Sequence, residues 1–295
     1  MRIVGLGVWA LLGVGMGSVI AQAQVDFTGD WNVLAHEDIV ERIPGPALGD
    51  YLGIPLNAAA RLRADSWDAS LLTMPEWQCR PHSSDYVWRG PSPMRIWKEM
   101  DPVRRDILAW RVQSAASGLE FSRTVYLDDR PHPPETAAHT WAGFSTGKWD
   151  GDMLTVTVTH LKEGYIRRNG VERSDLATVT EHWIRNGNYL TVATIIDDPV
   201  LLTEPFIRTT DFFLDLHVSP SWDPCEVKEE VVRPSGQVPH HLPGTNPFLH
   251  EFADKHGVPF EATRGGAETM YPEYRKRMKR ELSGASAKEG ASLYK

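Results

Sequence analysis

The sequence predicts a mainly β protein: an antiparallel meander that closes into a barrel, with one N-terminal helix and two short C-terminal helices. At least seven segments between residues 27 and 218 have strand composition, and few helical patterns separate them. Two turn dipeptides, Asp150-Gly151 and Asn186-Gly187, stand between alternating segments, which is typical of tight β-hairpins. After Cys225 the sequence becomes rich in proline and glycine, which marks the end of the strand-rich part.

The first 23 residues have the pattern of a secretory signal peptide. Arg2 precedes a long apolar run that ends in Ala21-Gln22-Ala23, a small-residue cleavage motif. A membrane anchor is the alternative, but the glycines in the run and the place of the motif favour cleavage before Gln24. We therefore expect an exported protein, located in the periplasm, with no membrane span after cleavage.

The remaining chain is expected to form one β-barrel domain over residues 24–282. A helical segment begins at about residue 245 of this domain, and residues 283–295 have the composition of a flexible tail. Strands are expected at 27–33, 94–100, 107–113 and 120–128, hairpins at 144–160 and 178–197, and a last strand at 206–218. One helix is expected at 55–72, a loop at 76–83, and C-terminal helices at 246–257 and 267–282, the second partly interrupted by Pro272.

The charge balance argues against a nucleic-acid partner. The whole chain has 31 basic and 39 acidic residues, and no basic patch dominates. Eleven tryptophans and 41% hydrophobic residues indicate a folded core. We expect a small aromatic or hydrophobic molecule as the partner, and the sequence leaves the oligomeric state open.

Only two cysteines are present, Cys79 and Cys225, and neither belongs to a C-x-x-C motif. Zinc and thioredoxin chemistry therefore lack support. In an oxidising compartment the pair can form one disulfide, and two buried thiols remain the alternative.

Most catalytic and cofactor signatures are absent from the sequence. No G-x-G-x-x-G, Walker loop or G-x-S-x-G occurs, so no cofactor is expected. The histidine-rich segment has no H-E-x-x-H spacing, so no metal site is expected there. Its histidines are His240, His241, His250 and His256.

The segment from 157 to 183 holds the strongest concentration of polar side chains. Leu154, Val156 and Val158 alternate with threonines, and continued alternation would point His160 into the core. On the next strand either Glu181 or His182 must face inward, and the sequence leaves that choice open. A buried Glu or His needs a partner or a function.

Basic groups and a turn lie between those two strands. Lys162, Arg167 and Arg168 precede Asn169-Gly170, a turn dipeptide that would fold them over one end of the barrel. Such cations could bind an anion or stabilise charge that develops on oxygen. A solvated, salt-bridged loop is the alternative. A second candidate is the stiff segment 126–135, whose prolines would hold His132 at the barrel rim, whereas Arg130 pairs with an aspartate in the plainer interpretation.

Long motifs of this chain resemble a large family of exported proteins from environmental bacteria. They include T-H-x-K-x-G-x-x-R-R-N-G from Thr159, H-x-L-P-G-T-N-P-F from His240 and a segment that starts at Trp141, and the resemblance covers about residues 90–278. Most members of this family are uncharacterised. The resemblance implies that the loop after His160 is functional.

The opening F-T-G-D-W is similar to the G-x-W that starts lipocalin-like barrels, whose lumen can hold one small ligand. The chain is also similar in kind to exported proteins of bacteria that degrade lignin-derived aromatics. One activity of such bacteria is a lyase that releases formaldehyde from a phenylcoumaran dimer and leaves a stilbene. This resemblance carries no residue across to the present chain.

We therefore predict an acid–base lyase or isomerase that acts on a small aromatic molecule, in one version by retro-aldol release of formaldehyde. A lipocalin-like periplasmic binding protein without catalysis is the alternative. The predicted catalytic residues are His160, Glu181, His182 and Tyr165. The predicted substrate-binding residues are Lys162, Arg167, Arg168, Asn169, His132, Arg130 and Trp141.

Overall fold

The structure of the chain is a computed structural model. It describes residues 25–34, 46–89, 92–114, 121–218, 225–229 and 231–280. The expected signal peptide and the expected tail at 283–295 lie outside the described residues. In the described part, no helix combines the length and apolarity needed to cross a membrane.

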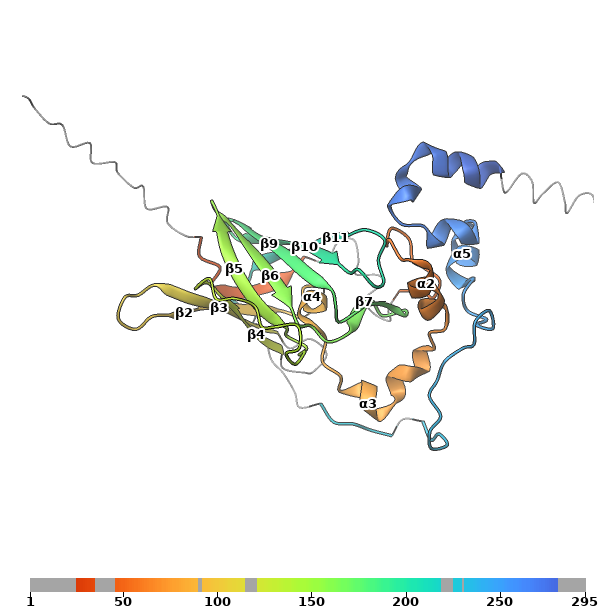
Figure 1. Cartoon of the computed structure of the whole chain (residues 1–295), viewed down its shortest axis with the longest axis horizontal. Coiled ribbons are helices and arrows are strands. Elements are labelled where there is room, and N and C mark those ends of the chain that lie inside the picture. Colours follow the sequence, from red (N-terminus) through yellow and green to blue (C-terminus); the bar gives the residue numbers. More distant parts are fainter. Residues whose placement is uncertain are drawn as a thin grey trace, which may run out of the picture.

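Nine strands form a closed barrel, as the sequence predicts (Figure 1). The barrel order is β1-β11-β10-β9-β6-β5-β4-β3-β2. The strands are β1 Gly29–Val33, β2 Met94–Met100, β3 Ile107–Ser114, β4 Phe121–Tyr126, β5 Phe144–Asp150, β6 Met153–Thr159, β9 Thr178–Asn186, β10 Tyr189–Asp197 and β11 Phe206–Leu214.

The barrel is mixed and not wholly antiparallel, which corrects the predicted meander. β4 and β5 pair in parallel through Val125 with Ser145 and Tyr126 with Thr146. The connection at 127–143 is long enough to carry the chain back before β5 begins. β5 therefore runs beside β4 in the same direction. Every other pairing around the barrel is antiparallel.

The two predicted hairpin turns form one residue later than expected. Asp150 pairs with Met153 and Asn186 with Tyr189, so glycine stands first in each two-residue turn. The glycines have φ of 58° and 60°, a left-handed conformation that glycine adopts without a Cβ clash.

Tryptophans fill the barrel interior. Leu154, Val156 and Val158 are fully buried, which confirms the inward face of β6. Aromatic rings pack edge to face beside them, with centroids 5.1 Å apart for Trp88 and Trp183. The largest interior side chains are Trp31, Trp88, Trp110, Trp183, Phe27 and Phe212, all at most 1% exposed.

A separate hairpin lies outside the barrel sheet, in the connection between β6 and β9. It consists of β7 Gly164–Arg167 and β8 Val171–Arg173. The short helix α4 Ser84–Val87 packs against β4 and β7 and is buried throughout. Arg173 and Asp85, both 0% exposed, join the hairpin to α4 through contacts of 3.1 and 3.3 Å. The hairpin therefore has a rigid base.

The predicted helix at 55–72 is broken in two. α2 Ala58–Asp65 begins at an Asn57 cap, and the 3₁₀ helix η1 Ala69–Thr73 begins at an Asp68 cap. Trp67 lies in this break and packs against the Tyr165 ring of the hairpin. The predicted loop at 76–83 contains a further helical turn, α3 Pro75–Gln78.

The C-terminal segment is a chain of short helical pieces beside α2 (Figure 1). They are α5 Glu251–His256, η3 Phe260–Arg264, η4 Ala267–Met270 and a helix at 272–280. The last helix begins at Pro272, because proline lacks an N–H and suits the first turn.

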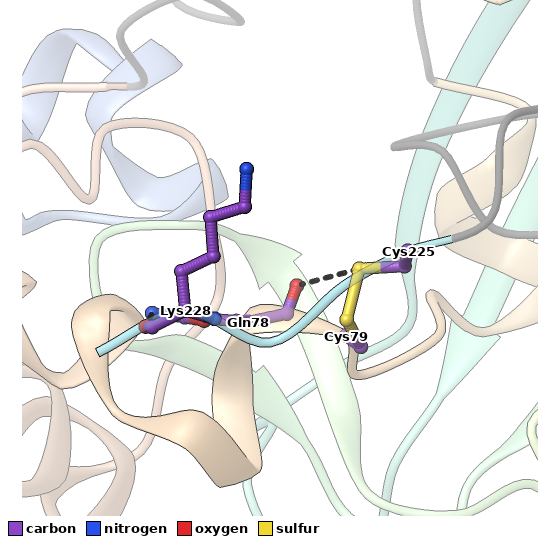
Figure 2. Close-up of a disulfide and its surroundings, with 4 residues drawn as sticks. All are labelled: Gln78, Cys79, Cys225 and Lys228. Carbon is purple, nitrogen blue, oxygen red and sulfur yellow. Dashed lines mark hydrogen bonds between the residues drawn. A yellow bond between two sulfur atoms is a disulfide. The ribbon is translucent and has the colours of Figure 1, made fainter. Parts of the chain in front are cut away.

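Cys79 and Cys225 form a disulfide, as the first of the two sequence alternatives proposed. Figure 2 shows how the segment after Cys225 runs along α3. The Gln78 amide donates to the Lys228 carbonyl oxygen at 2.6 Å, and the Lys228 N–H donates back to the Gln78 side chain at 2.7 Å. The disulfide and these hydrogen bonds fasten the segment at 225–228 to α3.

Replacement of both cysteines by serine should lower the free energy of unfolding by about 2–5 kcal/mol, because the bond spans 146 residues of chain. Urea unfolding of the oxidised protein and of the double variant measures this loss. Equal midpoints for the two proteins would contradict the expectation.

Candidate functional site

His160 leaves the strand instead of facing the barrel interior. β6 ends at Thr159, and His160 has a left-handed backbone with φ of 56°. Its ring nitrogens lie 2.7 Å from the Thr159 hydroxyl and 3.0 Å from the Pro134 carbonyl oxygen. The expected inward orientation is wrong, because a left-handed residue ends the alternation that the prediction assumed.

The next strand resolves the choice between Glu181 and His182. Glu181 is 0% exposed, and Arg123 of β4 donates to it at 3.0 and 2.5 Å. The Trp183 indole also donates to Glu181 at 2.9 Å. His182 lies on the other face, with its ring 3.0 Å from the Thr155 hydroxyl. Glu181 is thus a paired carboxylate inside a packed barrel.

Arg123 was not predicted from the sequence as a buried partner of Glu181. The signal was the alternation in β4, where Arg123 stands two residues before the buried Val125 and so shares its inward face. A buried guanidinium requires a buried carboxylate, and that requirement would have selected Glu181 over its neighbour.

The predicted shared site at the barrel end does not form. His132 contacts the hydroxyls of Thr146 and Thr159 at 2.8 and 2.7 Å, on the outer face of the sheet. Burial, and then the neighbouring His160, lower the pKa of His132. These histidines are therefore separated by the sheet from Glu181. Arg130 is 42% exposed and pairs with Asp128, as the plainer interpretation held.

Two of the predicted binding residues hold another segment of the chain. The Asn169 amide donates to the carbonyl oxygens of Ala47 and Asp50 at 3.0 and 2.9 Å. Arg167 contacts the Asp50 carboxylate at 3.1 Å. Gly170, with φ of 90°, lies against α2, where a Cβ would meet Trp67 at 2.6 Å. The Asn169-Gly170 turn therefore holds the hairpin against α2 and the segment at 47–50.

Aromatic and charged side chains gather around the β7–β8 hairpin, and we call this group the hairpin cluster. Tyr165 is its centre, with ring centroids 5.7 Å from Trp67, 6.2 Å from Trp77 and 6.4 Å from Tyr86. Tyr86 comes from α4, so this helix and the hairpin share one aromatic surface. The other members are Arg63, Arg80, His82, Trp141, Lys162, Glu163, Arg168 and Glu172.

Glu172 stands directly opposite Tyr165 in the antiparallel pairing of β7 and β8. Opposed residues of such a pair point to the same face, with Cβ atoms about 5 Å apart. Burial, and then the nearby Glu163, raise the pKa of Glu172 to about 7, although Arg63 lies 2.9 Å from its carboxylate. This carboxyl group can therefore take up and release a proton near neutral pH.

The Tyr165 hydroxyl is buried and has no hydrogen-bond partner among the described residues. Burial, and then the charge of Glu172, raise the pKa of Tyr165 well above its usual value. The phenol therefore keeps its proton and can donate it to an acceptor that enters the cluster.

A cation–aromatic stack borders the cluster. The Arg80 guanidinium lies 4.1 Å from the Trp77 ring and 4.9 Å from the Trp141 ring, and the Lys162 ammonium is 5.3 Å from Trp141. Lys162 and Trp141 are two of the predicted binding residues, and the structure brings them together. Such stacks recognise flat rings and anionic oxygen atoms.

His82 and Arg168 are two further members of the hairpin cluster that influence each other electrostatically. Burial, then Arg168 and Arg80, lower the pKa of His82 to about 4, so its imidazole is neutral at pH 7. The His82 ring packs on Tyr86 with centroids 4.6 Å apart. Arg168 thus acts on the protonation of both His82 and Tyr165.

Several members of the cluster were not predicted from the sequence. Arg80, Trp77 and His82 lie in the segment predicted as a loop, and no local motif marks them. Glu172 lies within the polar segment, but its burial follows only from the packing of α2 on β8. Among the described residues, no group of three or more histidine, cysteine, aspartate or glutamate side chains could hold a metal ion.

No protein-family model matches the chain. No curated protein matches it either.

Arg123→Met should lower the free energy of unfolding by about 3–5 kcal/mol, because it leaves the Glu181 carboxylate buried without its cation. The double variant Arg123→Met/Glu181→Leu should recover most of that loss. Chemical denaturation of the three proteins measures the difference, and a double variant no more stable than the single one would contradict the pairing.

The raised pKa of Glu172 predicts a pH-dependent stability. Its pKa is about 7 in the folded chain against 4.5 ordinarily, so the folded state binds more protons between these values. The stabilisation from this group is complete below pH 4.5 and is lost as the pH rises through 7. Relative to Glu172→Gln, the wild type should lose stability over this window.

Urea unfolding at several pH values between 4 and 8 measures this change. Glu204→Gln, at an exposed position, is the control and should follow the wild-type curve. Parallel pH curves for the wild type and Glu172→Gln would refute the shifted pKa.

Proposed function

We propose that the protein is an acid–base lyase or isomerase for a small aromatic molecule, and that the hairpin cluster is its active site. The observation that carries this proposal is the cross-strand pair of Tyr165 and Glu172. One member is a carboxyl group that titrates near pH 7, and the other is a buried phenol without a partner in the described chain. A base and a proton donor on one face are what proton-transfer catalysis requires.

The surroundings support an aromatic substrate that carries an oxygen atom able to become an anion. Trp77 and Trp141 offer ring faces, and Arg80 lies between them. Lys162 adds a second cation over Trp141. These groups could stabilise phenolate charge as it develops, which typically contributes more to catalysis than proton transfer alone.

The retro-aldol version of this reaction suits the pair. Glu172 would take the proton of a substrate primary alcohol, and the bond between the alcohol carbon and its neighbour would break to release formaldehyde. The electron pair would form a carbon–carbon double bond and expel an aryl ether oxygen as phenolate. Tyr165 and Arg80 would stabilise that phenolate, and the proton held on Glu172 would return to it. The step is redox-neutral and gives a stilbene from a phenylcoumaran.

We also propose that the protein works in the periplasm, as a member of the exported family that its motifs resemble. The disulfide between Cys79 and Cys225 supports an oxidising location. The barrel interior supports the enzyme over a lipocalin-like carrier with a lumenal ligand, because tryptophan side chains occupy the lumen.

Formaldehyde release from phenylcoumaran-type dimers tests the proposal. Wild-type kcat/KM should rise with pH through about 7, as the Glu172 carboxyl ionises. Glu172→Gln should lower kcat by about 10²–10⁴-fold, the usual contribution of a general base. Tyr165→Phe should lower kcat by about 10²–10³-fold, the effect of losing one donor to a developing oxyanion.

Two matched variants serve as controls. Glu204→Gln and Tyr189→Phe make the same chemical changes at exposed positions and should keep wild-type rates. Tight binding of an aromatic dimer without any product, unchanged by Glu172→Gln, would replace the lyase with a binding protein. Turnover that survives both cluster variants would place the active site elsewhere.

A further inference from the structure

A groove with a volume of about 690 Å³ lies between α5, η3 and the helix at 272–280. Leu52 lines it from the segment before α2, and Met278 lines it from the last helix. The volume falls in the usual range of small-molecule sites. We call this cavity the C-terminal groove.

Most of the groove lining is apolar. Val258, Pro259 and Ala262 contribute aliphatic groups from the turn after α5 and from η3. Leu52 and Val258 are 44% and 39% exposed, so this apolar lining is in contact with solvent. A lining of this kind favours a ligand that can cover it with its own apolar surface.

The helix at 272–280 is held against η3 near its start. Tyr274 is 9% exposed, and its hydroxyl donates to the Glu261 carbonyl oxygen at 2.9 Å. Met278 follows four residues later and therefore lies on the same face, one helical turn beyond the anchored tyrosine. The helix thus supplies an apolar side chain to the groove from a fixed position.

Two cations on this helix also line the groove, and we call them the groove cations. They are Arg275 and Lys279, whose spacing of four residues places them on one helix face, about 6 Å apart along the axis. Both side chains are exposed, and neither forms an ion pair within the described part of the chain.

The acidic residues of this segment line other cavities. Glu261 and Glu268 lie in a separate cavity, where arginine side chains accompany them. Glu273 lines a further one. The described lining of the C-terminal groove contains no carboxylate, so its two cations stand unbalanced in a chain whose net charge is −8. An anionic group would therefore be favoured beside them.

We propose that the C-terminal groove binds a carboxylic acid with a linear alkyl chain. The alkyl chain would lie on Val258, Ala262 and Met278, and the carboxylate would meet Arg275 and Lys279. Aliphatic side chains and a flexible methionine adapt well to such a chain. None of the groove residues belongs to the hairpin cluster, so this site is independent of the proposed active site.

Decanoate is the probe, in titration calorimetry of the full oxidised protein below the concentration at which decanoate forms micelles. It should bind with a stoichiometry of one. Decyltrimethylammonium, which has the same chain and the opposite charge, should bind about tenfold more weakly or worse. The double variant Arg275→Gln/Lys279→Gln should weaken decanoate binding by about 2–30-fold, the combined effect of two exposed cations. High salt should reduce that difference.

Matched variants separate the groove from general charge effects and from the active site. Arg104→Gln/Lys276→Gln removes the same two charges at exposed positions outside the groove and should keep wild-type affinity. Met278→Gln should weaken decanoate binding without a change of charge. Glu172→Gln should leave decanoate binding intact, so the groove can stand even if the proposed lyase fails. Thermal melting checks that each variant is folded.

Four outcomes would overturn the proposal. Decyltrimethylammonium could bind as tightly as decanoate, or the folded variant Arg275→Gln/Lys279→Gln could bind decanoate normally at low salt. Phosphatidylglycerol vesicles could sediment the protein while free decanoate does not bind, which would make the groove a membrane-docking surface. A dimer that Met278→Gln dissociates, again without decanoate binding, would make it an interface between two copies of the chain.

Discussion

The buried ion pair between Arg173 and Asp85 is the interaction on which the position of the β7–β8 hairpin depends. Both side chains are inaccessible to solvent, and Arg173 also donates to the carbonyl oxygens of Lys162 and Ser174. Burial opposes the charge on Asp85, but Arg173 and Arg208 outweigh it and lower the pKa of Asp85. Removal of either partner would leave an uncompensated charge in the interior, so the pair holds the hairpin and α4 together.

This pair positions the aromatic surface of the hairpin cluster. α4 carries Tyr86 into the cluster and leads to Trp88, which packs on Phe212. β7 carries Tyr165 to the same cluster, where Glu172 of β8 stands opposite to it. The base formed by the ion pair holds these side chains in place outside the barrel lumen, which is filled by aromatic rings.

Part of the candidate site could be predicted from the sequence, and the limits have physical causes. Tyr165, Lys162 and Trp141 were expected near a ligand, and they meet in the hairpin cluster. The orientation of His160 was predicted wrongly, because its own left-handed backbone ends the alternation of the strand. Glu181 was expected in a reactive role, but a partner 58 residues away in the sequence neutralises it. Glu172 and Arg80 could not be found, since their properties arise from burial by segments distant in sequence.

By itself, the sequence determined the nine barrel strands, the inward face of β6 and the positions of the two predicted hairpin turns to within one residue, because these depend on side-chain alternation and on local backbone preferences. It also determined which two cysteines were available to pair. It did not reveal the strands β7 and β8. Only the tertiary structure decided that β5 runs parallel to β4 and that the disulfide joins Cys225 to the end of α3. It also decided which polar groups of residues 157–183 lie inside the barrel, on its outer face or on the hairpin. Those outcomes depend on contacts between segments that are distant in the sequence. A charged side chain can be buried there only if another segment supplies its opposite charge.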